Sequence, residues 1–288
     1  MKAAKKQKKQ TYFGSMMKRL AKDKVAMFGL ILLVVMILAC AFANVLTPYS
    51  PTQMDPKSVF ASPSLAHPFG CDKLGRDVLC RLLYGGRYSL SLGILVSLIG
   101  MVLGIFFGAI FGYHGGKVDN ISMRVLDIWQ AIPGTLLAIL ISTALGNGFF
   151  QTVVALTIGG IPGSIRGTRA MALKEREMDY LEAARAMNCS TFKVIFKHMV
   201  PNVLAPTIVG TTMHIGSTIM EAASLSYIGL GIQPPMPEWG AMVADGKSYI
   251  LNHPHLLIYP GIMIALTVLA FNLFGDGLRD AMDPRLKD

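Results

Sequence analysis

Long apolar stretches alternate with polar connections along the chain. Six of these stretches are candidates to cross a bilayer, and they cover residues 25–46, 88–112, about 121–145, 149–165, 203–232 and 256–275. Each approaches or exceeds the roughly 20 residues that a helix needs to span the hydrocarbon core. The pattern therefore predicts an all-α, polytopic membrane protein with six transmembrane helices.

Composition is typical of a protein that lies in a bilayer. Hydrophobic residues make up 52% of the 288 positions and charged residues 15%, whereas about 25% of the residues in a soluble domain are charged. The net charge of +10 would suggest a nucleic acid partner for a soluble protein. In a membrane protein, an excess of Lys and Arg on the cytoplasmic side explains it. We therefore expect lipid contacts and no nucleic acid partner.

The basic amino-terminal segment predicts the orientation. Nine Lys and Arg residues precede the first apolar stretch. That stretch is longer than the apolar region of a signal peptide, and it ends in Thr47-Pro48-Tyr49 instead of small residues, so we expect it to stay uncleaved. With this segment in the cytoplasm, 21 Lys and Arg residues lie inside and six lie outside. This asymmetry predicts that both termini are cytoplasmic.

The same orientation divides the chain into parts. We predict a cytoplasmic tail at 1–24, a first transmembrane helix at 25–46, an extracytoplasmic loop at 47–86, a five-helix core at 87–276 with a cytoplasmic loop at 173–202, and a cytoplasmic tail at 277–288. Because prolines are frequent in the outer connections, we expect rigid irregular backbone there.

Two of the predicted transmembrane helices are irregular. The third is interrupted in its first half by Arg124, Asp127, Gln130 and Pro133, so we expect it to enter the membrane obliquely or to be buried among other helices. The fourth contains Gly159, Gly160 and Pro162, which predict a kink.

The second predicted helix carries a glycine at every fourth position. These glycines are Gly100, Gly104, Gly108 and Gly112. Four residues bring the same helix face round again, so the glycines form a smooth stripe for close helix packing. The partner helix is either in the same subunit or in a second one.

The cytoplasmic loop predicts a helix, a sharp turn and a second helix. Leu181, Ala184 and Met187 lie on one face of a helix at 178–187, and Asp179 is placed to cap or favour its start. Asn188 is a plausible end because Asn tolerates the left-handed conformation.

The second helix of this loop should cover 191–199. Ser190 is placed to cap it, and Pro201 should begin the following membrane helix. The small side chains of Ala183 and Ala184 would allow a partner's backbone to approach closely. The alternative is an amphipathic helix on the lipid surface, where Arg185, Lys193 and Lys197 would contact anionic headgroups.

Motifs for catalysis and metal binding are absent from the sequence. There is no phosphate-binding GxxxxGK[ST] motif, and the nearest match at Gly115-Gly116-Lys117 lacks both the earlier glycine and the following Ser or Thr. The cysteines show no CxxC spacing, so a zinc site is not expected. We predict that this chain is not an enzyme and holds no cofactor or metal.

Two ionisable residues lie in the fifth predicted span. His214 and Glu221 are seven residues apart and share a helix face. Since charges are costly in lipid, we expect both to face the protein interior or a water-filled path. They either line a route or its gate, or form a hydrogen-bonded pair that fixes helix packing.

Several blocks of the sequence resemble one family. Glu182-Ala183-Ala184, followed by a turn residue and a hydrophobic stretch ending in proline, resembles the Glu-Ala-Ala motif of permease subunits of ATP-binding cassette importers. Residues 69–81, 176–206, 221–240 and 272–285 are similar to the second permease subunit of dipeptide, oligopeptide and nickel importers. The resemblance covers nearly all of the chain after about residue 68.

This resemblance implies a type I importer permease fold, also called MetI-like, in a bacterial inner membrane. The implied partners are a second homologous permease, two ATPase subunits that bind ATP and Mg, and an extracytoplasmic substrate-binding protein. The cytoplasmic loop would couple the permease to an ATPase through Glu182, Ala183, Ala184 and Asn188, supported by Arg185. His214 and Glu221 remain candidates for the path or gate.

The sequence departs from the family pattern at three positions. Asn188 replaces the usual glycine of the turn, and Cys71 and Cys80 stand where Thr and Ser are common. The two cysteines either form a disulfide or replace small polar residues.

The sequence leaves alternatives open for both the function and the substrate. Uptake of short peptides is the main reading, and nickel or another small solute is the alternative substrate. A membrane scaffold that moves no solute is a second class of function. A secondary transporter with His214 and Glu221 as a proton relay is a third, which the lack of a recognisable internal repeat disfavours.

Overall fold

The computed structural model describes residues 12–282, and all of its regular elements are helical. In chain order these are α1 (Tyr12–Leu20), α2 (Lys24–Ala41), α3 (Ala43–Leu46), a 3-10 turn (Pro56–Ser58), α4 (Val78–His114), α5 (Gly116–Gln130), α6 (Gly134–Leu145), α7 (Phe149–Arg176), α8 (Asp179–Ala186), α9 (Thr191–Lys193), a π-helical segment (Val194–Met199), α10 (Val200–Tyr227), α11 (Trp239–Lys247) and α12 (His255–Met282). The all-α prediction is confirmed for the described residues.

Six spans were predicted. Among residues 12–282, four helices are long and apolar enough to cross a membrane, or five if one bent pair counts as a span. The helices α2, α4 and α12 and the continuous helix Thr191–Tyr227 qualify among residues 12–282. The helices α5 and α6, which cover the interrupted third span, qualify only as one pair, bent by 69° at their break. The fourth predicted span lies in α7, which has 28 residues and continues through Pro162, but glycines and polar residues in its apolar half lower its hydropathy.

Several boundaries differ from the predicted ones, two of them in the first third of the chain. The helix α4 begins at Val78, so residues 78–86 of the predicted outer loop form its first turns, and the Asp77 carboxylate caps them by accepting a hydrogen bond from Cys80 N at 2.6 Å. Near the amino terminus, α1 lies in the predicted tail and buries Met16 and Leu20 beside Leu278 of α12. Residues 1–11 and 283–288 of the predicted tails lie outside the described residues.

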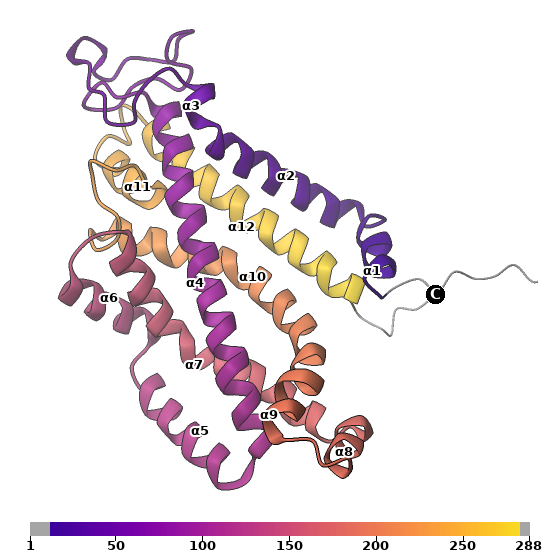
Figure 1. The fold of residues 1–288 in the computed structure, drawn as a ribbon. Coiled ribbons are helices and arrows are strands. Elements are labelled where there is room, and N and C mark those ends of the chain that lie inside the picture. Colours follow the sequence, from indigo (N-terminus) through magenta and orange to yellow (C-terminus); the bar gives the residue numbers. More distant parts are fainter. Residues whose placement is uncertain (1–11, 283–288) are drawn as a thin grey trace, which may run out of the picture.

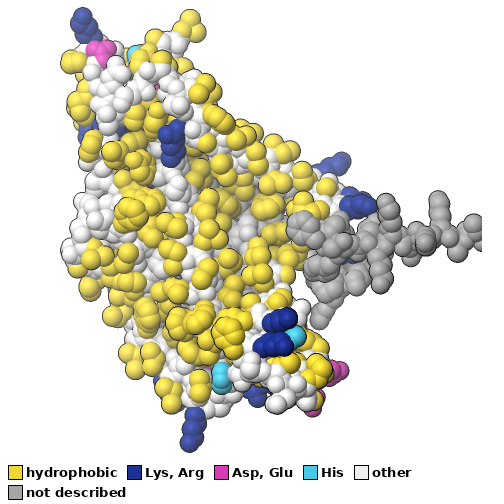
Figure 2. Space-filling view, viewed as in Figure 1, with side chains coloured by type: hydrophobic (Ala, Val, Ile, Leu, Met, Phe, Trp, Pro, Cys, Tyr) yellow, Lys and Arg dark blue, Asp and Glu magenta, His cyan; other side chains and the backbone are white. Residues whose placement is uncertain are grey.

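Figure 1 shows an elongated helical body with two distinct ends. One end carries α3, the irregular residues 47–77 and α11, and is called the loop end below. The other carries α8, α9 and the start of α5, and is called the α8 end. The long helix α4 runs between them, with α2 and α12 side by side along one flank. On the face shown in Figure 2, apolar side chains cover a broad midsection and Lys and Arg side chains gather toward the ends.

The glycine stripe packs within the subunit. A Cβ atom added to Gly104 would lie 2.8 Å from Ser164 O of α7, and one added to Gly108 would lie 2.7 Å from Ile165 O. At Gly112 the nearest atom is the Cβ of Ala172, at 2.7 Å. The reading of close packing inside one subunit is therefore confirmed, and α4 and α7 form a closely joined pair.

Candidate functional site

The helix α8 forms the first arm of the predicted helix–turn–helix. It begins one residue later than predicted, because Met178 occupies the N-cap position. The Met178 side chain makes no cap hydrogen bond. Asp179 is therefore the first helical residue and not the cap, although its charge in the first turn favours the helix dipole.

The turn after α8 is built as the sequence predicts. Asn188 adopts the left-handed conformation with φ of 57°. Its N–H donates to Arg185 O at 2.9 Å, and the N–H of Cys189 donates to Ala184 O at 3.2 Å. These two bonds define a Schellman motif, so the prediction that Asn188 ends the helix is confirmed.

The buried face of α8 packs on the chain's own helices. Leu181 is fully buried and Ala184 is 2% exposed, and both contact a cluster that includes Val194, Ile195 and Met199. The prediction that Ala184 is open to a partner is therefore wrong, because its methyl group fills this cluster. Glu182, Ala183, Arg185 and Asn188 are exposed.

The residue Met187 was predicted to share that buried face, but it is 72% exposed. The reason is that α8 ends at Ala186, so Met187 already belongs to the turn. The Arg185 guanidinium, in contrast, is held by the protein. It donates to Arg176 O of α7 at 3.1 Å and lies over the ring of Tyr113 of α4.

The second arm continues directly into the membrane helix. The predicted break at Pro201 is absent, because the helix runs from Thr191 to Tyr227 with a π-helical segment at Val194–Met199. Ser190 stands at the N-cap position, but its side chain makes no cap hydrogen bond. The second arm of the loop and α10 are therefore parts of one continuous helix.

A cavity of about 510 Å³ lies between α4, α6, α7 and α10. His214 and Glu221 both line it and both are exposed. No hydrogen bond joins their side chains within the described part of the chain, so the reading of a hydrogen-bonded packing pair is wrong. The structure brings both residues to one cavity, as their helical spacing predicts.

The cavity wall combines glycines and hydroxyl groups with apolar side chains such as Met101, Leu156 and Met171. A Cβ atom added to Gly160, Gly163 or Gly167 of α7, or to Gly210 of α10, would meet nothing within 4 Å. The hydroxyl-bearing residues in the wall are Ser97, Thr135, Ser164, Thr168, Thr207 and Thr211. Among residues 12–282, Glu221 is the one acidic residue that lines the cavity, and no Lys or Arg lines it. The lining therefore offers hydrogen bonds and a single carboxylate.

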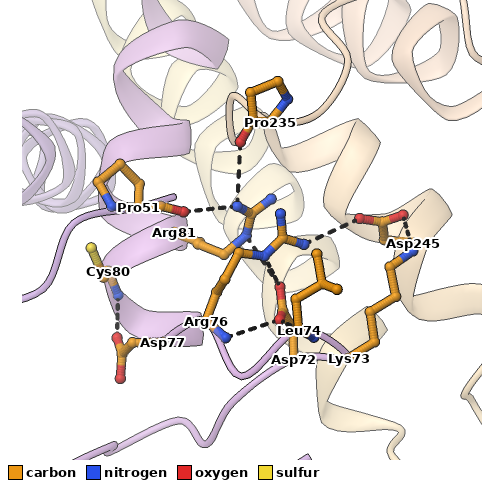
Figure 3. Close-up of polar contacts among 10 residues, drawn as sticks. All are labelled: Pro51, Asp72, Lys73, Leu74, Arg76, Asp77, Cys80, Arg81, Pro235 and Asp245. Carbon is orange, nitrogen blue, oxygen red and sulfur yellow. Dashed lines mark hydrogen bonds and ion pairs between the residues drawn. The ribbon is translucent and has the colours of Figure 1, made fainter. Parts of the chain in front are cut away.

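At the loop end, two buried arginines join residues 47–77 to α4 and α11, as Figure 3 shows. Arg76 and Arg81 are 2% and 3% exposed and share the Asp72 carboxylate, which lies 2.6 Å from Arg76 Nε and 3.5 Å from Arg81 Nε. Arg81 also donates to Pro51 O at 2.9 Å. Asp245 of α11 lies 3.8 Å from Arg76. These contacts fix the irregular residues 47–77 onto α4 and α11.

The cysteines at the loop end are free thiols. Cys71 and Cys80 form no disulfide, and the Cys80 thiol instead donates to Tyr49 O at 3.1 Å, as a hydroxyl would. The disulfide reading is therefore wrong, and the substitution for small polar residues fits. Burial, together with the charges of Asp77 and Asp72, raises the pKa of the Cys71 thiol to about 11.

One buried carboxylate at the loop end was not predicted from the sequence. Glu238 is 1% exposed and caps α11 by accepting from Ala241 N at 2.9 Å, and it also accepts from Ser89 Oγ of α4 at 2.8 Å. Burial raises the pKa of this carboxyl group. Glu is not among the residues that usually cap a helix, so the sequence carries no clear signal for this cap.

Two family models match this chain. One, described as "Binding-protein-dependent transport system inner membrane component", matches residues 100–288. The other, described as "N-terminal TM domain of oligopeptide transport permease C", matches residues 11–63. Together they cover most of the chain.

Named relatives and solved structures agree with these matches. The chain is 45% identical over 258 residues to "Glutathione transport system permease protein GsiD" of Pectobacterium atrosepticum, covering 89% of this chain and 86% of the relative. It is 41% identical over 270 residues to "Dipeptide transport system permease protein DppC" of Alkalihalophilus pseudofirmus, covering 94% and 89%.

Among solved structures, a chain of the inward-facing MetNI methionine ABC transporter matches with a TM-score of 0.56 at 19% identity, covering 69% of this chain and 95% of that one. This likeness confirms the predicted MetI-like fold. Beyond the shared fold, the two family models and the two relatives show which family the chain belongs to. The chain belongs to the family of binding-protein-dependent transport system inner membrane components and is an integral inner membrane permease.

Proposed function

We propose that this chain is the permease subunit of an ATP-driven importer of short peptides. Relatives at 45% and 41% identity carry names for glutathione and dipeptide transport, and both of these solutes are short peptides. The observation that carries the proposal is the cavity between α7 and α10. Its hydroxyl groups offer hydrogen bonds to a peptide backbone, and its open glycines leave room for side chains of different kinds.

The remaining parts of the importer come from partner subunits. Two ATPase subunits bind ATP and Mg, a second homologous permease completes the path, and an extracytoplasmic protein delivers the peptide. The excess of Lys and Arg near the termini and in residues 173–202 supports a cytoplasmic position for both termini and for the α8 end.

In this proposal the exposed side of α8 docks on an ATPase subunit. Glu182, Ala183, Arg185 and Asn188 offer a free surface, while Ala184 supports it from beneath. The Schellman bonds after Arg185 hold the turn in one conformation. A movement of α8 is therefore transmitted through the turn to the helix that follows it, and is not lost in a change of the turn's shape. Continuity with α10 supports transmission toward the cavity.

His214 and Glu221 would line the route of the peptide. A carboxylate within a membrane protein favours a cationic partner, and the amino group of a peptide supplies one. We expect Glu221→Gln to reduce uptake while leaving the amount of folded protein unchanged. Normal uptake with loss of folded protein would instead assign Glu221 a structural role.

The deciding experiment is uptake of a labelled dipeptide into proteoliposomes that contain the complete complex and its binding protein. We expect accumulation that requires ATP and is unaffected by a proton gradient. Proton-driven uptake without ATP would refute the proposal. ATP-driven accumulation of nickel without accumulation of the dipeptide would keep the importer role and reject the peptide.

A further inference from the structure

The hydroxyl group of Tyr180 lies between the α8-end termini of α7 and α10. It donates a hydrogen bond to Glu175 Oε1 in the last turn of α7, at 2.5 Å. It accepts one from Asn202 Nδ2 in the first turn of α10, at 2.8 Å. One side chain of α8 therefore contacts both helices that form the walls of the cavity.

The side chain of Asn202 is itself fixed. Its amide nitrogen also donates to His198 O at 3.1 Å, in the π-helical segment that precedes α10. The result is a continuous chain of hydrogen bonds from Glu175 through Tyr180 and Asn202 to the backbone of the helix. Two acceptors for one amide set its orientation, because hydrogen bonds are directional.

The protonation of Tyr180 suits this position. Burial and the hydrogen bond to Glu175 raise the pKa of its phenol to about 12. The hydroxyl group therefore keeps its proton at physiological pH and can donate and accept at the same time.

The other contacts of α8 are less suited to set an angle toward α10. Leu181 and Ala184 make apolar contacts, and such contacts are not directional. The Arg185 side chain is bonded to α7 and lies over a ring of α4, not of α10. Within residues 12–282, the bond from Asn202 to Tyr180 is the one that joins a side chain of α8 to α10.

The helix α10 connects this bond to the cavity. Thr207, Gly210 and His214 follow Asn202 on the same helix and line the cavity. The preceding Val194–Met199 segment is π-helical, a local geometry that is often found at functional sites. A rotation of α8 that keeps its bond to Asn202 must therefore move α10.

We propose that Tyr180 and Asn202 form a positioning pair that transmits movement of α8 to the cavity wall on α10. The inference rests on the proposed function, because it assigns to that importer the contact between its ATPase-docking helix and its solute path. Neither residue needs to touch the solute or the ATPase.

The test measures ATP hydrolysed per peptide transported by the complete complex in proteoliposomes. Tyr180→Phe removes both bonds of the hydroxyl group with little change of shape, and Asn202→Ala removes the partner. We expect each variant to raise the ratio roughly two- to tenfold, the range set by losing one neutral hydrogen bond, that between Asn202 and Tyr180. The double variant should be no worse than the more affected single variant, because both act through one contact.

The matched control is Tyr227→Phe, a half-exposed tyrosine at the loop end of α10 whose hydroxyl group makes no hydrogen bond within the described residues. It should leave the ratio unchanged. An unchanged ratio in Tyr180→Phe, or additive effects in the double variant, overturns the pair. Loss of the ATPase subunits from purified Tyr180→Phe complexes also overturns it, because the contact would then serve assembly. Absence of ATP-driven uptake in the wild type would overturn the proposed function itself.

Discussion

Substitution of Gly108 by alanine should loosen the packing of α4 on α7. The new methyl carbon would lie 2.7 Å from Ile165 O and 2.9 Å from Arg169 N, about 0.7 Å inside the ordinary contact distance of 3.4 Å. These atoms belong to the backbone of α7, so no side chain can rotate away. The glycines one turn to either side pack equally closely, so relief requires a shift of the whole helix. Overpacking of this kind typically costs about 1–3 kcal/mol.

The control for this prediction is Gly261→Ala. Gly261 lies in α12 and a Cβ atom there would meet nothing within 4 Å. Both variants gain the same helix propensity, up to about 1 kcal/mol for Gly to Ala, so their difference isolates the clash. Gly100→Ala should fall between them, because its nearest neighbour is the movable Ser164 hydroxyl group at 3.2 Å.

The assay is thermal unfolding of the purified protein in detergent, followed by the loss of monodisperse protein on size-exclusion chromatography. We expect Gly108→Ala to unfold several degrees below Gly261→Ala, since about 1 kcal/mol shifts the midpoint by about 2–4 °C in a chain of this size. Equal midpoints for the two variants would refute the close packing of α4 on α7.

Three further outcomes are expected. Ala184→Asp should destabilise the protein by at least about 3 kcal/mol because it buries a charge in an apolar cluster. Ala183→Asp, at an exposed position, should leave the folded yield unchanged and lower the amount of ATPase that co-purifies. A greater loss of folded protein in Ala183→Asp than in Ala184→Asp would contradict the burial of this face of α8. Asn188→Gly should keep the turn, whereas Asn188→Val should destabilise it by about 1–2 kcal/mol because the backbone there has a positive φ. The measurement is amide hydrogen exchange in α8, which should be faster in Asn188→Val. Equal exchange rates in the two variants would contradict the Schellman geometry. A thiol whose pKa is about 11 stays neutral at neutral pH, so Cys71 should resist maleimide at pH 7 and react increasingly as pH rises toward 11; full labelling at pH 7 in the folded protein would contradict its burial.

Local and periodic features of this fold could be predicted from the sequence. The stripe of glycines needs only a four-residue repeat to indicate a close helix contact, and Asn188 needs only its tolerance of positive φ to indicate a turn. His214 and Glu221 needed only their spacing to be placed on one face. Each of these inferences depends on residues within two helical turns.

Features set by distant contacts could not be predicted in the same way. The alanine pair at 183–184 looked equally open to a partner at both positions, and only the cluster formed by Val194, Ile195 and Met199 decides that Ala184 is buried. Likewise, the arginines of the loop end could be assigned to a side of the membrane, but not to their partners. Asp72 is near them in sequence, whereas Asp245 lies on a different helix.

The two walls of the cavity differ in how firmly they are held. On one side, α7 is backed by α4 with backbone-to-backbone contact along the glycine stripe. On the other, α10 faces open space at Gly210 and begins in a π-helical segment. The loop-end half of α10 also packs closely, since a Cβ atom added to Gly240 of α11 would lie 2.2 Å from Ala223 O. Separating α7 from α4 would give up close packing over several turns, whereas a shift of the α8-end half of α10 across the cavity leaves the contact at Ala223 in place. A change in the width of the cavity should therefore come from α10.

This difference predicts which distances change during the ATPase cycle. Spin labels at Val102 of α4 and Val154 of α7 should keep one distance with and without ATP in the assembled complex. Labels at Val154 and at Ile208 of α10 should change theirs, since all three positions are exposed and can carry a label. If the first distance changes and the second does not, the cavity opens between α4 and α7, and the glycine stripe is then a sliding surface instead of a fixed joint.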